Sequence, residues 1–205
     1  MNWEQVDNLL KEQITNNSDI HSGYIKIKQT LTDYGLPTIE INIDELKKEF
    51  NNWLSEVIKK ESLPKNIKSV YFGITTMKFP KIDNGKEKTT VYISGSQLSP
   101  EQDVDWACDT EYFPCNRYIL LTEFNKIDII IKNNKNLDAN YKVLLFNGLL
   151  NLLVINSLND FKDRLLTYHD KKFGLFKTTK KRDSLSIGTG FDSGDLYLLN
   201  KIKNQ

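Results

Sequence analysis

The chain is poor in the residues from which most catalytic and metal sites are built. Its 205 residues include two histidines, His21 and His169, and two cysteines, Cys108 and Cys115. Two histidines cannot form a three-histidine metal site, and the sequence contains no HExxH pattern. Residues 109–114 separate the cysteines, whereas two residues separate those of thioredoxin-like pairs and zinc knuckles. We therefore expect free thiols, no metal site and no cofactor.

Long apolar runs, phosphate-binding motifs and an excess of charge are also missing. The most apolar run, 143–155, is interrupted by polar residues and is shorter than the roughly 20 residues that cross a bilayer. The Gly188-Thr189-Gly190 segment lacks the rest of a nucleotide-binding fingerprint. A net charge of +1 gives no general attraction to nucleic acid or membranes. The first residues have no signal-peptide pattern, so we expect a cytoplasmic location and no membrane partner.

The pattern of apolar residues predicts a single α+β domain over residues 1–205. Helical spacing dominates the N-terminal third, residues 1–63, whereas β-branched and aromatic residues dominate the middle, residues 67–123. A helix that is apolar nearly all round is expected over residues 138–160, and such a helix is usually central. A hairpin is predicted over residues 184–199. The simplest architecture is an antiparallel sheet with hairpins packed against several helices.

Local signals refine these boundaries. Asp44 is predicted to cap the third helix, and a turn at Asp83-Asn84-Gly85 is predicted to join the first two strands. Residues 117–122 read as a third strand. Residues 124–131 fit both a helix and a strand by their spacing, and we favour the helix.

The most distinctive stretch is the long connection from Ser94 to Tyr118. It is too long for a hairpin turn, and it carries acidic and aromatic side chains but neither Lys nor Arg before Arg117. A long loop of this kind is more often a functional surface than a simple connector. The candidate partner-binding residues in it are Asp103, Asp105, Trp106, Asp109, Glu111, Tyr112 and Phe113.

The same loop leaves other interpretations open. Trp106 and Phe113 fit equally well as core residues beneath the loop. Cys108 or Cys115 fits a nucleophile with His169 as its base, although acidic neighbours disfavour a thiolate. Otherwise the two thiols pack as small hydrophobic groups. The loop carboxylates also fit a divalent-ion site or a glycosidase-like pair, but they do not follow the calcium-loop pattern.

The segment 162–182 carries the opposite charge. Its Lys and Arg residues outnumber its acidic residues, Asp163 and Asp170, and Phe173 and Phe176 are interleaved with them. This composition fits a nucleic-acid patch, a solvated face, or a segment that neutralises the acidic loop within the fold. We rank nucleic-acid binding below the other functions.

Two segments resemble bacterial immunity proteins of polymorphic-toxin or contact-dependent inhibition systems. In residues 187–199 a small residue, an aromatic residue and an Asp-x-Gly-Asp turn precede an apolar strand. This order is similar to the closing hairpin of several α+β immunity families, including SUKH-like proteins. Trp-Ala-Cys-Asp at 106–109, Tyr-Phe-Pro at 112–114 and Arg-Tyr at 117–118 resemble uncharacterised families near such loci. The resemblance implies an immunity function and transfers no site residues.

An inhibitor can cover the basic active site of a nuclease with carboxylates that steer association and aromatic rings that hold it. We therefore expect a non-catalytic immunity protein whose partner is a basic, cognate protein toxin. The alternative is a hydrolase that uses loop carboxylates or a cysteine nucleophile. The sequence specifies neither the toxin nor the oligomeric state.

Overall fold

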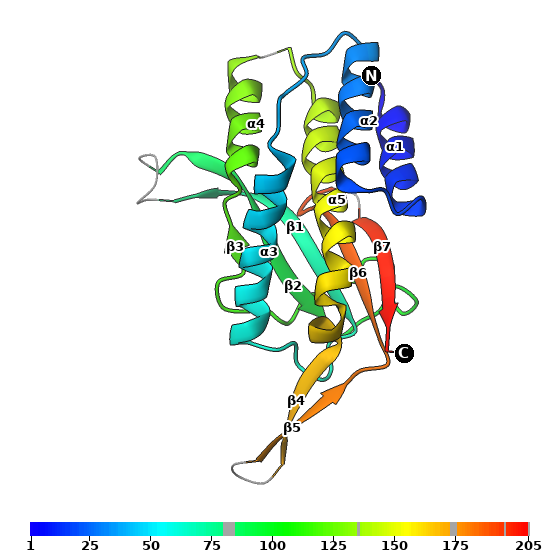
Figure 1. The fold of residues 1–205 in the computed structure, drawn as a ribbon, viewed down its shortest axis with the longest axis vertical. Coiled ribbons are helices and arrows are strands. Elements are labelled where there is room, and N and C mark those ends of the chain that lie inside the picture. The colour runs from blue at the N-terminus through cyan, green and yellow to red at the C-terminus, as the bar shows by residue number, and fades with distance from the viewer. Residues whose placement is uncertain (80–84, 135, 173–175, 195, 205) are drawn as a thin grey trace.

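The computed structural model describes residues 1–79, 85–134, 136–172, 176–194 and 196–204 (Figure 1). These residues form one α+β domain with a five-stranded sheet and a separate two-stranded hairpin, so the predicted fold class is confirmed. The helices of the described chain are α1 (Trp3–Thr15), α2 (Ile20–Asp33), α3 (Ile43–Lys60), α4 (Thr122–Asn133) and α5 (Ala139–Leu166). The strands are β1 (Ser69–Lys78), β2 (Glu87–Ser96), β3 (Tyr118–Ile119), β4 (Thr167–Lys172), β5 (Phe176–Lys181), β6 (Ser184–Phe191) and β7 (Leu196–Lys203).

The large sheet has the strand order β3-β2-β1-β6-β7 and is mixed rather than wholly antiparallel. The central pair β1 and β6 is parallel, whereas the other neighbouring strands run antiparallel. β1 and β6 run parallel because α5 and the β4–β5 hairpin return the chain to the end of the sheet at which β1 begins. The backbone nitrogen of Arg182 donates to Leu166 at the end of α5, and Ser186 of β6 donates to Lys68 beside the start of β1.

One face of the large sheet is covered by helices (Figure 1). Its apolar residues, among them Val70, Phe72 and Ile74 of β1, belong to the main hydrophobic core. Helix α5 is buried along nearly all its length and contacts α1, α2, α3, α4 and the sheet, as its apolar composition predicts. By length and composition α5 alone among the described helices would cross a membrane, but 83% of its apolar stretch is buried inside the protein.

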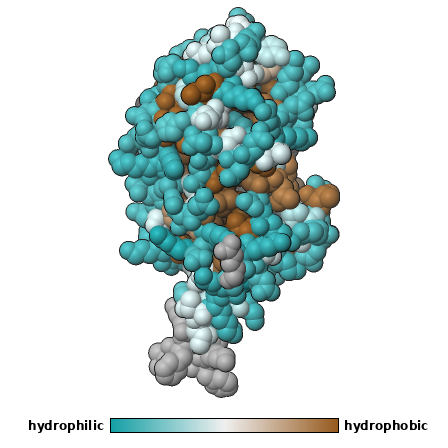
Figure 2. All heavy atoms as spheres, turned by 45° about the vertical axis from the view of Figure 1, so that its right-hand side comes forward, coloured by the Kyte–Doolittle hydropathy of each residue, from teal (hydrophilic) through white to brown (hydrophobic). Residues whose placement is uncertain are grey.

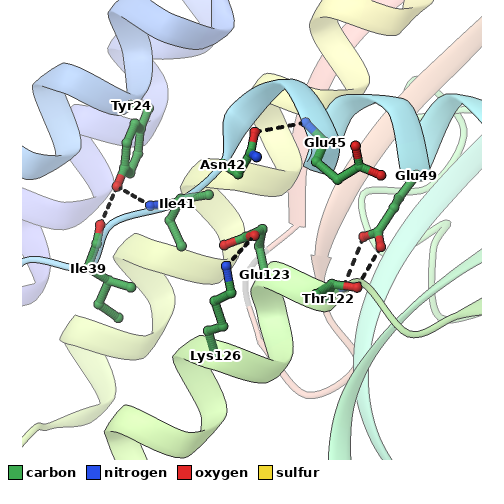
Figure 3. A network of polar contacts seen from close by, with 9 residues as sticks. All are labelled: Tyr24, Ile39, Ile41, Asn42, Glu45, Glu49, Thr122, Glu123 and Lys126. Atoms are coloured by element: carbon green, nitrogen blue, oxygen red, sulfur yellow. Dashed lines mark hydrogen bonds and ion pairs between the residues drawn. The ribbon is translucent and has the colours of Figure 1, made fainter.

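Polar contacts define where the helices begin (Figure 3). Asn42, not Asp44, caps α3, because its side chain accepts a hydrogen bond from the Glu45 nitrogen at 3.1 Å. The expected cap of α5 is confirmed, since Asp138 accepts from the Tyr141 nitrogen at 2.9 Å. In α2, the Tyr24 hydroxyl bonds the backbone of the connection to α3.

Residues 124–131 are helical and belong to α4. The expected third strand over 117–122 is shorter than predicted, because α4 already begins at Thr122. No side chain of its own caps this helix; instead Glu49 of α3 accepts from the Thr122 nitrogen at 2.9 Å and from its hydroxyl at 2.5 Å (Figure 3). Contact with α3 therefore decides where the strand gives way to the helix.

The two hairpins differ in their surroundings. The C-terminal hairpin β6–β7 is confirmed, lies at one edge of the large sheet, and extends to Lys203. The β4–β5 hairpin instead projects from the end of α5 away from the sheet (Figure 1). The turn predicted at Asp83-Asn84-Gly85 lies outside the described residues except for Gly85. Figure 2 shows a largely hydrophilic surface with hydrophobic atoms gathered near the middle of one side.

Candidate partner-binding site

The second face of the large sheet carries a row of aromatic rings instead of helices. Because side chains alternate along a strand, Tyr71 of β1 and Tyr92 of β2 point away from the core residues beside them. Ring centroids are 6.2 Å apart between Trp106 and Tyr71, 6.0 Å between Tyr71 and Tyr92, and 5.9 Å between Tyr92 and Tyr118. The row follows the strand order across the sheet, with Tyr118 on β3 and Trp106 supplied by the loop.

Two glycines in the strands make room for these rings. A Cβ atom at Gly73 would lie 2.2 Å from the ring of Tyr92, and one at Gly188 would lie 2.9 Å from the indole of Trp106. Any larger residue would have to displace a ring. Glycine within a strand often marks such a close approach, and here it lets aromatic rings lie directly on the sheet.

The acidic loop, defined here as residues 97–117, is held to the fold by buried side chains and backbone bonds. Trp106 is 1% exposed and Tyr112 is 7% exposed. Backbone bonds join Gly95 and Tyr112 in both directions, at 2.9 and 3.0 Å, and the indole of Trp53 donates to the Asn116 carbonyl at 3.0 Å. The loop is therefore fastened to the fold at several points along its length.

The aromatic candidates of the loop fall into two groups. Trp106 and Tyr112 are buried, so in this structure they support the loop rather than face a partner. The interpretation of Trp106 as a core residue is therefore correct, but the same interpretation of Phe113 is wrong because Phe113 is 48% exposed. Val104, which the sequence analysis did not single out, is 78% exposed between two aspartates.

The four predicted carboxylates of the loop reach the surface. Asp105, Asp109 and Glu111 are exposed, and Asp103 is half-buried. Asp103 accepts from the Asp105 nitrogen at 2.8 Å, and Glu111 accepts from the Gln97 nitrogen at 3.0 Å. Within the described parts of the chain, none of the four forms an ion pair with a Lys or Arg side chain.

A neighbouring carboxylate of the loop does form an ion pair, and this pairing lowers its pKa. Glu101, at the start of the loop, accepts a hydrogen bond from Lys201 of β7 at 2.6 Å. This bond, with further help from Ser99, lowers the pKa of Glu101 to about 2. The charge of Glu101 is thus largely balanced within the protein, unlike those of the four predicted carboxylates.

A cavity of about 620 Å³ lies between the acidic loop, the outer face of the sheet and the β6–β7 turn. The strands supply Tyr71, Thr75, Met77, Tyr92 and Tyr118. The loop supplies Asp105, Ala107, Cys108, Thr110 and Phe113, and the turn with its flanking strands supplies Phe191, Asp192, Gly194 and Leu196. The volume is in the range of known ligand pockets, about 300–1,000 Å³.

Asp192 joins the β6–β7 turn to the aromatic row. The Tyr92 hydroxyl donates a hydrogen bond to a carboxylate oxygen of Asp192, and the Tyr71 hydroxyl donates to the Phe191 carbonyl at 3.2 Å. Burial, followed by the charge of Asp192, raises the pKa of Tyr71 well above its ordinary value. Burial and the hydrogen bond to Asp192 raise the pKa of Tyr92 in the same direction. The phenols of Tyr71 and Tyr92 therefore stay neutral near pH 7 and above it.

The cysteine and histidine candidates do not come together. Both thiols are free and exposed, so the interpretation of Cys108 and Cys115 as packed hydrophobic groups is wrong. Cys108 lines the cavity, whereas His169 contacts Thr179 at 3.2 Å in the β4–β5 hairpin and lines a different cavity. No group of three or more potential ligands is placed to hold a metal ion among the described residues.

The basic segment 162–182 does not neutralise the acidic loop through the side chains that the structure describes. Lys180 pairs with Asp170 at 3.0 Å, and Lys181 pairs with Asp163 at 3.2 Å. Arg182 is buried, not solvated, and its guanidinium donates to backbone carbonyls around the start of β1 and the end of α5. Burial lowers the pKa of Arg182 to about 10.

The sequence analysis missed the contribution of the strands to this site. Tyr71 and Asp192 lie far from the acidic loop in sequence and Tyr92 lies in the preceding strand, so the loop composition gave no sign of them. One signal was present, because large aromatic residues alternate with core residues along β1 and β2 and therefore need a second cover. The strand glycines Gly73 and Gly188 were a further signal.

Comparison of the chain with known protein families, with curated proteins and with solved structures finds no match. The geometry of the site is therefore the basis for a functional proposal.

Proposed function

We propose that the chain is a non-catalytic protein-binding protein that uses the acidic loop to neutralise a basic partner. In the form suggested by the immunity-protein resemblance, the partner is a cognate bacterial toxin, and the loop covers its basic surface. The carrying observation is a set of four surface carboxylates that form no ion pair with a Lys or Arg side chain of the described chain, on a loop that buried aromatic residues hold in place.

Two physical effects support this proposal. Carboxylates concentrated on one loop produce a local negative field even though the net charge of the chain is only +1, and such a field accelerates encounter with a basic surface. A loop that is already ordered loses little conformational entropy on binding, which favours affinity. Phe113 and Val104 add exposed apolar surface beside the acidic side chains.

The proposal is tested by co-expressing the chain with the proteins encoded beside its gene. We expect to recover a stoichiometric basic protein that is toxic when expressed alone. Association and dissociation rates with that protein are then measured over a range of ionic strength for the wild type and for the double variant Asp105→Asn/Asp109→Asn. We expect association to slow by about 10-fold at low salt, with a smaller effect at high salt.

The matched control is Glu56→Gln/Asp160→Asn, which removes two exposed carboxylates from α3 and α5. It changes the net charge by the same amount but leaves the acidic loop intact. Its association rate should stay within about 2-fold of the wild type, since the effect depends on local charge. Equal slowing in both double variants would show that the loop is not the interface.

A further inference from the structure

The cavity beneath the acidic loop combines aromatic rings with carboxylates from two separate walls. Its strand wall includes Tyr92 and Tyr118, which are half-buried, and Tyr71, which is 4% exposed. Asp105 comes from the loop and Asp192 from the β6–β7 turn. Neither Lys nor Arg is among the described residues that line it. A cavity with this lining is chemically suited to a cation that also has a flat face, because rings attract its charge and carboxylates accept its hydrogen bonds.

An internal contact shows that rings at this cavity accept a guanidinium group. The guanidinium carbon of Arg117 lies 4.7 Å from the ring centroid of Tyr118 and 5.0 Å from that of Phe113. Arg117 is not one of the residues that line the cavity, so it contacts the two rings without filling the space between the walls. The half-buried ring of Tyr92 has no such internal cation among the described residues.

Asp192 is held in a fixed position in this cavity. The Tyr92 hydroxyl donates to one of its oxygens, and the backbone nitrogen of Asp192 donates to the Ile74 carbonyl of β1 at 3.1 Å. Asp192 forms no ion pair within the described chain. A carboxylate that is oriented in advance and lacks a cationic partner is a suitable acceptor for a bidentate guanidinium.

We propose that this cavity receives an arginine side chain of the basic partner. The proposal rests on the proposed function, because it names the group of that partner which enters the cavity. A protein side chain fits better than a free small cation, since the exposed Asp109 and Glu111 belong to the loop that forms one wall of the cavity. In this proposal their charges, on the same loop, contact the rest of a basic protein. A buried arginine inside a polar rim is the usual arrangement of an interface hot spot.

The cavity is tested without the partner, with N-acetyl-arginine amide as the probe and N-acetyl-citrulline amide as the neutral control of the same shape. Amide chemical shifts of the isotopically labelled protein are followed during each titration. We expect saturable shifts around Tyr71, Tyr92, Asp105 and Asp192, with a dissociation constant in the millimolar range. The citrulline compound should bind at least about 10-fold more weakly, because it lacks the charge that the rings and carboxylates attract.

Two variants test whether arginine amide binds in this cavity. Asp192→Asn removes the charge but keeps an oxygen that accepts from Tyr92, so the fold should persist, and arginine binding should weaken by about 10-fold. Asp160→Asn is the matched control, since Asp160 is an exposed acid of α5 that does not line the cavity. It should change arginine binding by less than about 2-fold. Shifts elsewhere, or equal binding of citrulline, would overturn the proposal.

The two proposals fail in different ways. If Asp105→Asn/Asp109→Asn slows association with the partner while arginine amide does not bind in the cavity, the acidic surface is functional and the arginine proposal is wrong. If arginine amide binds in the cavity but no basic protein depends on the loop carboxylates, the cavity is a cation site and the proposed function is wrong. With the partner in hand, Asp192→Asn should accelerate dissociation by about 10-fold, since a hot-spot contact acts mainly after encounter.

Discussion

The two faces of the five-stranded sheet are covered in different ways. The helix-covered face consists of aliphatic and aromatic side chains packed against α5 and α3, in one continuous core. The loop-covered face consists of tyrosines, a tryptophan and glycines beneath a segment without regular structure. The cavity between the first face and helices α4 and α5 has a volume of about 320 Å³, whereas the cavity on the second face has about 620 Å³.

We expect the helix-covered face to contribute mainly to stability and the loop-covered face mainly to binding. Helices satisfy their own backbone hydrogen bonds, so they can bury an apolar face completely. A loop must bond its backbone to neighbouring groups and therefore covers a sheet less completely. Tyrosine suits such a face because its ring packs while its hydroxyl reaches a partner, as Tyr92 does with Asp192. The less completely covered face is consequently the one at which we propose that a partner binds.

The largest expected difference between the faces comes from truncating one aromatic residue on each. Phe72 of β1 contacts Phe50 of α3 and is fully buried, so Phe72→Ala should lower the free energy of unfolding by about 4 kcal/mol. Trp106→Ala should cost only about 2 kcal/mol, because the loop can detach locally while the helices and sheet remain folded. Urea unfolding measures both losses.

Hydrogen exchange checks the same pair of variants. In Trp106→Ala, faster exchange should be confined to amides of residues 97–117, while in Phe72→Ala it should spread through the sheet and α5. Global acceleration in Trp106→Ala would mean that the loop belongs to the same cooperative unit as the core.

A smaller loss of stability is expected from adding a methyl group to the strand beneath the indole of Trp106. The added methyl group of Gly188→Ala would lie 2.9 Å from Trp106 and 3.1 Å from Leu196, so the ring must shift. We expect a loss of about 1–2 kcal/mol in the free energy of unfolding. Adding Trp106→Leu should make the glycine substitution nearly harmless, which a double-mutant cycle by urea unfolding measures. Additive losses would contradict the direct contact.

The smallest expected effect is a loss of stability at alkaline pH, which buried tyrosines near the acidic loop cause. Burial raises the pKa values of Tyr71, Tyr92 and Tyr112 above the value near 10 of an unfolded chain. Above pH 10 the unfolded state loses these protons more readily than the folded state, so stability falls as the pH rises. Urea midpoints at pH 8 and 10.5 should show a smaller decrease for Tyr92→Phe than for the wild type.

The control for this comparison is Tyr34→Phe, which removes a tyrosine that is 41% exposed. Its urea midpoint should fall between pH 8 and 10.5 as much as that of the wild type. If the urea midpoint of Tyr92→Phe falls as much as that of the wild type between pH 8 and 10.5, groups other than Tyr92 cause the alkaline sensitivity.

The sequence was most informative where one local pattern was strong. The helical spacing of α3, the nearly continuous apolar surface of α5 and the C-terminal hairpin all correspond to elements of the structure. Local patterns failed where another element decided the outcome. Glu49 of α3 begins α4 at Thr122 and shortens β3. The cap of α3 was missed for a local reason instead, because the side-chain oxygen of Asn42 rather than Asp44 accepts from the Glu45 nitrogen.

The acidic loop illustrates the same limit for the site. Its composition correctly identified surface carboxylates at Asp105, Asp109 and Glu111, since charged groups avoid burial without a partner. It did not distinguish the buried Trp106 from the exposed Phe113, because both are large and apolar and only their neighbours determine which one is covered. The burial of Arg182 was missed for the same reason. Its charge predicts exposure, but carbonyls from the end of α5 and from the α3–β1 connection surround its guanidinium.

The sequence by itself determined the α+β class, the central helix and the presence of an unusual acidic and aromatic loop, since each follows from spacing or composition within one segment. Only the tertiary structure decided that β1 and β6 run parallel and that Tyr71, Tyr92, Asp105 and Asp192 share one cavity. The physical reason is that hydrophobic burial is non-directional: it specifies which side chains leave water, whereas the packing of distant segments specifies which of them meet.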